Sequence, residues 1–529
     1  MKIIGYEKRK NKELFKSFKN LKTLDIKEIQ NYIPIYNKFF NFDKTQEINL
    51  DNYNFITNIE DNESDNEDEF PEKIFNVELN ATMKKKSFLK LIPVIESSQF
   101  LTGKYKLTDE EFYKLPNIEN NGHSDFYDMN NISYIDSLFS FLSSKLLNTY
   151  HFENAIDYYG SFLSIIDNFK LDISDDIEYY DGSDFFMKNK NKLFRVEDEN
   201  SPPPLIFEDT DQAIDFDSLE TIDTLETFEN SVIEVTPEID STKSSDSLPE
   251  PLSDSGSDSV SDSGSESVSD SGSDSGSLSC PSSESDTMEE VNVIFNKYLV
   301  QITCLEHCVD TLDTLILTNS LKSEDEWLSC LFQIIIILIV FQDTFSFTHN
   351  DLHTNNVMYV HTDKEFLSYC YRGIYYKIPT FGRIFKIIDF GRSIYKVNGQ
   401  ICCSNSFRPA GDASTQYNCE PYFNPKKKRI DPNFSFDLCR LACSIWDNIG
   451  NQQKTGVSKI IDEWCKDDKG INVLYKSNGE ERYPNFKLYK MIARTVHNHI
   501  PHNQLQRPEF SKFITTPIDA IMLDEIPKF

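Results

Sequence analysis

The sequence predicts an α+β protein in which a strand-rich first part and a helix-rich second part are separated by a long acidic segment. Segments typical of strands recur up to about residue 310, and segments with helical spacing of apolar residues dominate from about residue 311. The stretch from Glu197 to Glu290 contains 27 acidic residues and one basic residue, Lys243, so it cannot supply a hydrophobic core.

Three segments around the acidic stretch define the first part. Apolar residues at positions 135, 138, 139, 142 and 146 have helical spacing, which predicts a helix over Ser133–Tyr150. The next segment, "NAIDYYGSFLSII", is typical of a strand, and so is "NVIFNKYLVQITCLEH" after the acidic stretch.

The second part begins with a long helix, predicted over Ser323–Phe345 and led by three acidic residues that suit the helix dipole. Its apolar run "LFQIIIILIVF" is shorter than the roughly 20 residues that span a bilayer, so we expect a buried core helix and no membrane contact. The segment "GRIFKIIDFGRSIY" is predicted to be a strand ending in a polar turn. Residues 361–383 are predicted to form an extended hairpin, and the chain from Phe434 onward to be mostly helical.

The charge is concentrated in one segment. Of the net charge of −33, the stretch from Glu197 to Glu290 carries −26 and the other 435 residues about −7, so no basic footprint for nucleic acid is present. Residues 253–276 form an eight-residue repeat, "SDSGSDSV SDSGSESV SDSGSDSG", whose composition predicts disorder. A second acidic loop covers Ile59–Lys73. The long segment is a candidate for binding basic partners and, because acid surrounds its serines, for phosphorylation.

All 11 cysteines lie at or after Cys280, in an odd number and at irregular spacings, which favours a reducing cytoplasmic compartment over a disulfide framework. Cys402, Cys403 and Cys419 lack a CxxC partner, so ordinary thiols are favoured over a metal site. The N-terminal "MKIIGYEKRKNKELF" has no apolar region of the kind that marks a signal peptide. No oligomeric state is predicted.

The polar stretch "FTHNDLHTNNVMYV" directly follows the long apolar helix. In it Asp351 and Asn356 are five residues apart, and Asp389, in "IIDFG", comes 33 residues later. Phosphoryl transfer needs a carboxylate beside the attacking hydroxyl and metal ions that neutralise the phosphates. Mg²⁺ prefers one or two protein oxygens together with phosphate and water. These three side chains are such a set, and the apolar helix would hold them rigidly.

"HNDLHTNN" followed by "IIDFG" resembles the catalytic loop and DFG motif of the protein-kinase-like superfamily. The His-x-Asp-Leu-His form is similar to haspin-type atypical Ser/Thr kinases, aminoglycoside phosphotransferases and ABC1-like kinases. With "FDLCRLACSIWD", the chain also resembles uncharacterised kinase-like proteins of giant amoeba-infecting DNA viruses. The resemblance implies a bilobal fold with an antiparallel-sheet N-lobe and a helical C-lobe. It also implies Ser/Thr protein kinase activity with ATP and Mg, a protein substrate, and a location in the host cell or virion.

The resemblance further implies a role for each matching residue of the catalytic loop. Asp351 would be the catalytic base that orients the substrate hydroxyl, and Asn356 and Asp389 would hold magnesium. His353 stands where the family usually has a lysine that stabilises the γ-phosphate, and a neutral imidazole would do so less well. The flanking residues implied to pack or brace this loop are His349, Phe390 and Asp437.

Nucleotide contacts are implied in the first part. "KSFLKLIP" resembles the strand whose lysine grips the phosphates, which would be Lys90; a surface lysine at a strand edge is the alternative. "CLEHCVDTLDTLI" resembles the hinge, with Leu305 as gatekeeper and backbone groups from Glu306 to Cys308 facing adenine. The expected organisation is an N-terminal extension over 1–80, the first part of the N-lobe over 81–195, a disordered insertion over 196–290, the last strand and hinge over 291–310, and a helical C-lobe over 311–529.

Several features depart from the family pattern. No glycine-rich phosphate loop exists, because Gly5 is the only glycine before Lys90. Phe88 stands where a small residue is usual and would crowd the adenine pocket. The predicted helix has no glutamate to pair with Lys90, and Asp136 is the nearest acidic substitute. Asn350 replaces the family's arginine, and no A-P-E sequence follows the DFG motif.

Three interpretations follow. The leading one is an atypical Ser/Thr protein kinase that uses ATP and magnesium. The second is a pseudokinase scaffold with an acidic interaction tail, favoured by the missing glycine loop and by Phe88. The third is a small-molecule kinase of the aminoglycoside-phosphotransferase type, distinguished by its substrate.

Overall fold

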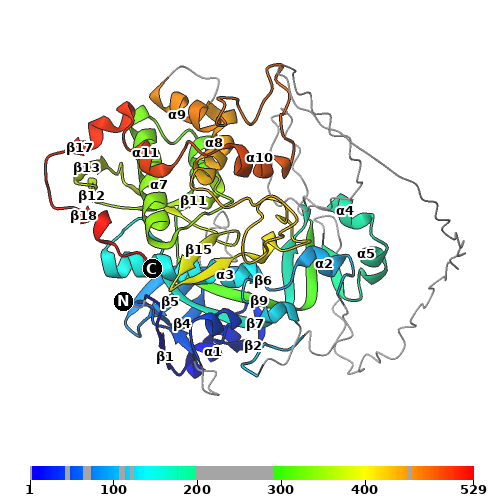
Figure 1. Cartoon of the computed structure of the whole chain (residues 1–529). Coiled ribbons are helices and arrows are strands. Elements are labelled where there is room, and N and C mark those ends of the chain that lie inside the picture. Colours follow the sequence, from blue (N-terminus) through cyan, green and yellow to red (C-terminus); the bar gives the residue numbers. More distant parts are fainter. Residues whose placement is uncertain are drawn as a thin grey trace, which may run out of the picture. The chain divides into compact units, whose positions relative to one another are not determined.

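The strands of the first part form a seven-stranded antiparallel sheet in the order β2-β7-β9-β6-β5-β4, with β8 paired to β9 (Figure 1). The computed structural model describes residues 3–41, 48–62, 73–105, 113–119, 124–174, 177–197, 291–449 and 455–529. The sheet strands are β2 (Asp25–Gln30), β4 (Ile56–Asp61), β5 (Ile74–Leu79), β6 (Met83–Pro93), β7 (Tyr158–Asp172), β8 (Phe194–Glu197) and β9 (Asn292–Glu306).

The longest pairing in this sheet joins β7 and β9, which are 15 residues each. Their register runs from Tyr158 opposite Leu305 to Asp172 opposite Asn292. Most positions of β9 are buried, including successive residues that point to opposite faces, so both faces of the sheet are covered here. The predicted strand after the acidic stretch is confirmed, and the one before it begins later than its sequence pattern indicates, at Tyr158.

Helix α3 (Ile132–Tyr150) packs beside β7 and β9 (Figure 1) and confirms the helix predicted over Ser133–Tyr150. Its N-cap is Asn131, whose side chain accepts a hydrogen bond from the Ser133 N–H at 3.0 Å. It ends at His151, which adopts the left-handed conformation that often terminates helices. The helix is buried along most of its length, and this explains its many small serines.

Helix α7 (Glu324–Phe345) confirms the long helix of the second part, with the Ser323 hydroxyl accepting the Glu326 N–H at its N-terminus. The apolar run alone is shorter than a bilayer span, but the helix as a whole is 22 residues and is, among the described residues, the one long and apolar enough to cross a membrane. Of its most apolar window, 94% is buried inside the protein, as in a core helix.

The strands after α7 form smaller sheets, one of which also includes β10 from before that helix. Strands β10, β11 and β14 form one antiparallel sheet, and the hairpin predicted over 361–383 is confirmed by β12 and β13, which pair from Phe366 opposite Pro379 to Tyr371 opposite Ile374. The strand bounds are β10 (Asp310–Thr311), β11 (Val357–His361), β12 (Phe366–Tyr371), β13 (Ile374–Pro379), β14 (Arg383–Ile387), β15 (Ile394–Val397), β16 (Gln400–Cys403), β17 (Ile514–Thr515) and β18 (Ile521–Met522).

From Phe434 onward helices are the main regular elements, with two short strands, β17 and β18, near the end. The prediction of a mostly helical segment is wrong, because helices cover less than half of the described residues there. Its helices are α8 (Phe436–Ile449), α9 (Gly456–Trp464), α10 (Lys487–Thr495) and α11 (Pro501–Gln504). The other α-helices and short strands are β1 (Tyr6–Glu7), α1 (Lys12–Lys19), β3 (Asn49–Leu50), α2 (Ser97–Leu101), α4 (Ile177–Asp181), α5 (Asp184–Asn189) and α6 (Leu312–Leu317).

The two acidic segments lie largely outside the described residues. Strand β4 ends at Asp61 and β5 begins at Ile74, so residues 63–72 of the predicted acidic loop fall between two paired strands. Residues 198–290 fall between β8 and β9. The predictions made for these two stretches therefore stay predictions.

Candidate functional site

Lys90 lies on β6, which is paired on one side with β5 and on the other with β9. Along this strand Ser87 and Leu89 are buried, whereas Phe88 and Lys90 share the other face and are half-buried. The alternative of a surface lysine at a strand edge is therefore wrong, because the strand is internal and the ammonium group is engaged on both sides.

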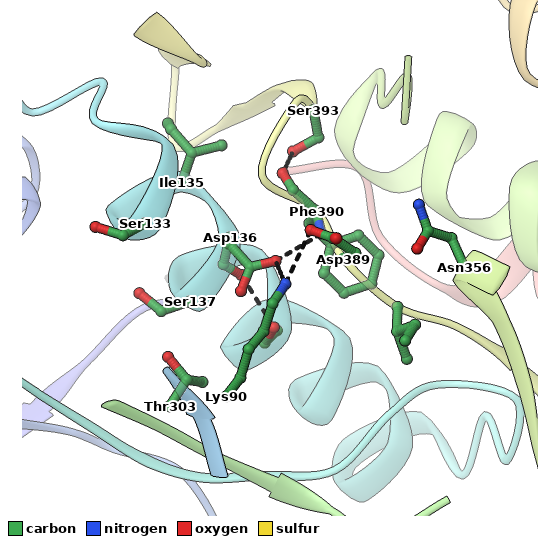
Figure 2. A network of polar contacts seen from close by, with 12 residues as sticks. Lys90, Ser133, Ile135, Asp136, Ser137, Thr303, Asn356, Asp389, Phe390 and Ser393 are labelled. Atoms are coloured by element: carbon green, nitrogen blue, oxygen red, sulfur yellow. Dashed lines mark hydrogen bonds and ion pairs between the residues drawn. The ribbon is translucent and has the colours of Figure 1, made fainter. Parts of the chain in front are cut away.

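Two carboxylates hold the Lys90 ammonium group (Figure 2). Its Nζ is 2.8 Å from Oδ1 of Asp136 on α3 and 2.9 Å from Oδ1 of Asp389, which follows β14. The Asp136 Oδ1 also accepts the backbone N–H of Phe390 at 2.6 Å. Asp136, which the sequence offers only as the nearest acidic substitute, therefore ties β6, α3 and the DFG segment together.

The two carboxylates of this cluster lie in different surroundings. The Asp136 side chain is 1% exposed and that of Asp389 is 48% exposed. Burial raises the pKa of Asp136, and although the Lys90 ammonium opposes this, the Asp136 Oδ2 is buried without a hydrogen-bond partner among the described residues. For Asp389 burial also acts to raise the pKa, but Lys90 outweighs it and the net pKa is lowered. Asp389 is thus an ionised carboxylate that is open to a ligand.

The loop that carries Asp351 is braced from below by Asp437 on α8. The fully buried carboxylate of Asp437 accepts the His349 N–H at Oδ2 and the Asn350 N–H at Oδ1, each at 2.9 Å. Asn350 has a φ of +66°, a left-handed conformation that costs free energy for a residue with a Cβ. The bracing role that the sequence assigns to Asp437 agrees with these contacts, because they hold the strained residue directly before Asp351.

Asp351 is oriented by groups from three elements. Its Oδ1 accepts the Tyr489 hydroxyl of α10 at 2.7 Å, and its Oδ2 is 3.6 Å from a guanidinium nitrogen of Arg392. Arg392 is in turn fixed by Asp412 at 2.7 Å. Burial acts to raise the pKa of Asp351, but Arg392 and Arg440 outweigh it and the net pKa is lowered. Asp351 is therefore ionised at neutral pH, as a proton-accepting carboxylate must be.

His353 and Asn356 lie beside Asp351 in the same loop. The Asn356 amide nitrogen donates to the Asp351 carbonyl oxygen at 2.9 Å and contacts Nε2 of His353 at 3.1 Å. Burial lowers the pKa of His353, against the opposing effects of Asp351 and Asp389. Both carboxylates therefore lie within electrostatic reach of one neutral imidazole.

The loop and the DFG segment are joined through their backbones. The Ile388 N–H donates to the Asn356 carbonyl at 3.0 Å, and the Ile388 carbonyl contacts Nε2 of His349 at 2.9 Å. Phe390 packs against His349, with ring centroids 5.9 Å apart, and against Phe139 of α3 at 4.7 Å. The predicted packing of His349 with Phe390 is confirmed, and these contacts fix Asn356 and Asp389 relative to each other.

The hinge residues occupy the end of β9 beside β6. Leu305 is buried and lies opposite Phe88 and Tyr158 on the two neighbouring strands. The Glu306 N–H donates to Asp157 and its carboxylate pairs with the buried Lys386 at 2.8 Å. The Glu306 N–H is therefore engaged within the protein and is not free for a ligand.

Oxygen ligands for a metal come from two of the predicted residues. Figure 2 shows the amide oxygen of Asn356 on the side that faces Asp389, and among the described residues it accepts no hydrogen bond. No group of three or more His, Cys, Asp or Glu side chains arranged to hold a metal occurs in the described part of the chain. One carboxylate and one amide oxygen fit Mg²⁺ brought in with phosphates, not a metal caged by protein alone.

Tyr489, Arg392 and Asp412 are missing from the sequence-based site. Arg392 carries a weak signal, since it is a cation three residues after Asp389. Tyr489 and Asp412 carry none, because they reach the loop from 138 residues downstream of Asp351 and from a turn 20 residues past Arg392.

Comparisons with known proteins were made for the whole chain. No protein-family model matches the chain, and no curated protein matches its sequence.

Proposed function

We propose that this chain is an atypical Ser/Thr protein kinase that transfers the γ-phosphoryl group of ATP, with Mg²⁺, to hydroxyl groups of proteins. The contact that carries the proposal is the Lys90 ammonium bound between Asp136 and Asp389. It brings together an ammonium group, which would bind phosphate, and an exposed, ionised carboxylate, which would bind Mg²⁺, from positions 299 residues apart in the chain. The bilobal fold is part of this proposal, supported by a sheet with α3 in the first part and helices in the second.

Each side chain has a task that its surroundings support. Asp351 would accept the proton of the substrate hydroxyl, because its carboxylate is ionised and held in place. Asp389 and Asn356 would hold Mg²⁺, which neutralises phosphate charge when bound. Lys90 would hold the phosphates of ATP. His353 would add a hydrogen bond and no positive charge, since its pKa is lowered.

A pseudokinase scaffold is the second candidate, and one observation favours it. The connection between β4 and β5, the strands on the β6 side of the sheet, has no glycine in residues 62–73. Instead it contains six acidic residues from Glu63 to Glu72, which would repel a triphosphate if they lay near it. Phe88, which is half-buried on the same strand face as Lys90, also favours the scaffold.

Nucleotide binding and transfer separate the two candidates. The melting temperature of the full chain should rise with Mg·ATP, and rise less in Asp389→Asn, because a ligand that binds only the folded state stabilises it. With radiolabelled ATP, the wild type should label a mixed set of protein substrates and Asp351→Asn should not. Asp363→Asn, at an exposed carboxylate on the loop before β12, is the matched control.

Binding without transfer would replace the kinase proposal by a nucleotide-binding scaffold. Absence of both would leave a scaffold that binds no nucleotide.

A further inference from the structure

A basic loop lies in the segment that follows the DFG turn. Lys426, Lys427 and Lys428 are exposed, and they form no ion pair with any residue that the structure describes. Arg429 next to them is different, because its guanidinium group is bound by Glu420 and Asp431. The loop therefore presents three cations that have no counter-charge among the residues that the structure describes.

The loop is held in a defined conformation by Asn418. The buried Asn418 amide donates to the carbonyls of Asn424, Lys427 and Lys428 at 3.1, 3.1 and 3.0 Å. Its Oδ1 accepts the Asn424 N–H at 2.8 Å. A single buried side chain thus fixes the backbone on which the lysines stand, and this lowers the entropy that a ligand must remove to be bound by them.

The same segment is bonded to the candidate catalytic loop. Tyr417, the neighbour of Asn418, donates its hydroxyl to Oδ1 of Asn350 at 2.7 Å, and Asn350 directly precedes Asp351. Helix α10, which has basic residues and no acidic residue, also contacts Asp351, through the Tyr489 hydroxyl. On α10 the exposed Arg494 donates to the Thr415 carbonyl at 2.7 Å, which joins the helix to this segment.

We propose that the hydroxyl substrate of this site is an acidic, serine-containing segment bound by Lys426–Lys428, and that residues 253–276 of this chain are such a substrate. The inference rests on the proposed function. The repeat contains twelve serines, and each one has Asp or Glu next to it. Its charge complements the three lysines, and opposite charges of this kind favour encounter and specificity.

The length of chain between the repeat and β9 is compatible with this binding. Fourteen residues separate Gly276 from Val291, where the described chain resumes before β9. Fully extended, such an arm covers about 50 Å, which is enough to cross much of a domain of this size.

In the proposed transfer ATP is the phosphoryl donor and ADP is the leaving group. A serine Oγ forms a bond to the γ-phosphorus, the bond from that phosphorus to the β,γ-bridging oxygen breaks, and ADP leaves with the electron pair. The serine proton goes to Asp351. Each phosphate adds about −1.5 to −2 charges to an already acidic segment, so the product is bound more tightly than the substrate unless salt screens it.

The test compares two peptides on the full chain with Mg·ATP. One has the sequence of residues 253–276, and the other replaces its Asp by Asn and its Glu by Gln. The variant K426E/K427E/K428E reverses the loop charges, and K8E/K10E/K12E reverses three exposed lysines at the N-terminus as a matched control. We expect the ratio of kcat/KM for the acidic over the neutral peptide to fall by about tenfold or more in the loop variant and to stay unchanged in the control.

An unchanged ratio in the loop variant, or equal rates for both peptides on the wild type, overturns the inference and leaves the kinase proposal intact. If the wild type labels the mixed protein substrates but neither peptide, the inference alone is overturned. If it labels neither those substrates nor the peptides, the kinase proposal fails and binding becomes the deciding measurement. Fluorescence anisotropy of the labelled acidic peptide should then still show binding that weakens with salt and is lost in the loop variant. No such binding overturns the inference as well.

Discussion

Two fully buried carboxylates on helices, Asp136 on α3 and Asp437 on α8, are bonded in different ways. Both oxygens of Asp437 accept backbone N–H groups of the loop that carries Asp351, from His349 and Asn350. In Asp136 one oxygen accepts both Lys90 and Phe390, and the other has no partner among the described residues. The region around Asp437 is thus saturated and acts as a brace. At Asp136 one buried carboxylate oxygen is still able to accept a hydrogen bond, which is typical of a site that binds a ligand.

The largest effect is expected at the carboxylate that the Asp437 brace positions. Asp351→Asn removes the proton acceptor while keeping the shape of the side chain, so phosphoryl transfer should fall by about 10²- to 10⁴-fold. The melting temperature should fall modestly, because the Asp351 charge beside Arg392 and Arg440 is lost. Transfer rates by the variant and by Asp363→Asn are compared under identical conditions, and a rate near that of the wild type would remove Asp351 from the chemistry.

The brace itself is tested by Asp437→Asn. The amide carbonyl can accept one of the two backbone N–H groups, whereas its NH₂ group faces the other, which is left buried without a partner. Stability should fall by about 2–3 kcal/mol, measured as a shift of the urea midpoint at constant slope. The same substitution at Asp136 should cost less, since one oxygen there is already unpaired and its carbonyl can still accept Phe390.

If the two asparagine variants lose equal stability, the distinction between a saturated and an unsaturated region is wrong.

Removing the Lys90 ammonium group that pairs with Asp136 should have a smaller effect on stability, and one that depends on pH. Lys90→Met leaves Asp136 buried without its counter-charge, so its pKa, already raised by burial, should rise further. A carboxyl with a folded-state pKa above its unfolded value binds more protons when folded, so stability is lost as pH rises between these two values. The variant should lose about 1–3 kcal/mol at pH 8 and less at pH 4.5.

The double variant Lys90→Met/Asp136→Asn provides the control, because it has no buried carboxyl to ionise. Its stability should recover at pH 8 and depend less on pH. A double variant as pH-dependent as the single one would show that another group is titrating.

The smallest effect is expected at Tyr489. Tyr489→Phe removes the hydroxyl that donates to Asp351, so the lowered pKa of that carboxyl should move toward its usual value. A carboxyl with a lowered folded-state pKa contributes stability that is present above its unfolded pKa and lost as pH falls. The variant should therefore lose about 1 kcal/mol or less at pH 7.

The acidic limb of the activity profile should shift to higher pH in this variant. An unchanged limb would mean that Arg392 and Arg440 alone keep Asp351 ionised.

Much of the site could be predicted because its residues stand in local patterns. The apolar periodicity of the preceding segments marks a helix before Asp351 and Asn356 and a strand before Asp389. Polar residues directly after such buried elements are natural candidates for a functional site. The helix over 133–150 could be predicted for the same reason, although its apolar run does not say which of its polar residues faces Lys90.

The sequence by itself determined the long helices and the strands on either side of the acidic stretch, where acidic charge is concentrated, and which polar side chains follow the apolar elements, because propensity, periodicity and side-chain chemistry are local properties. Only the tertiary structure decided that Asp136 meets Lys90, that Asp437 holds a strained loop, that Tyr489 and Arg392 flank Asp351, and that Tyr417, in the segment before Lys426–Lys428, is bonded to Asn350. These contacts join residues far apart in the chain, and their geometry depends on how strands and helices pack, which no short window of sequence contains.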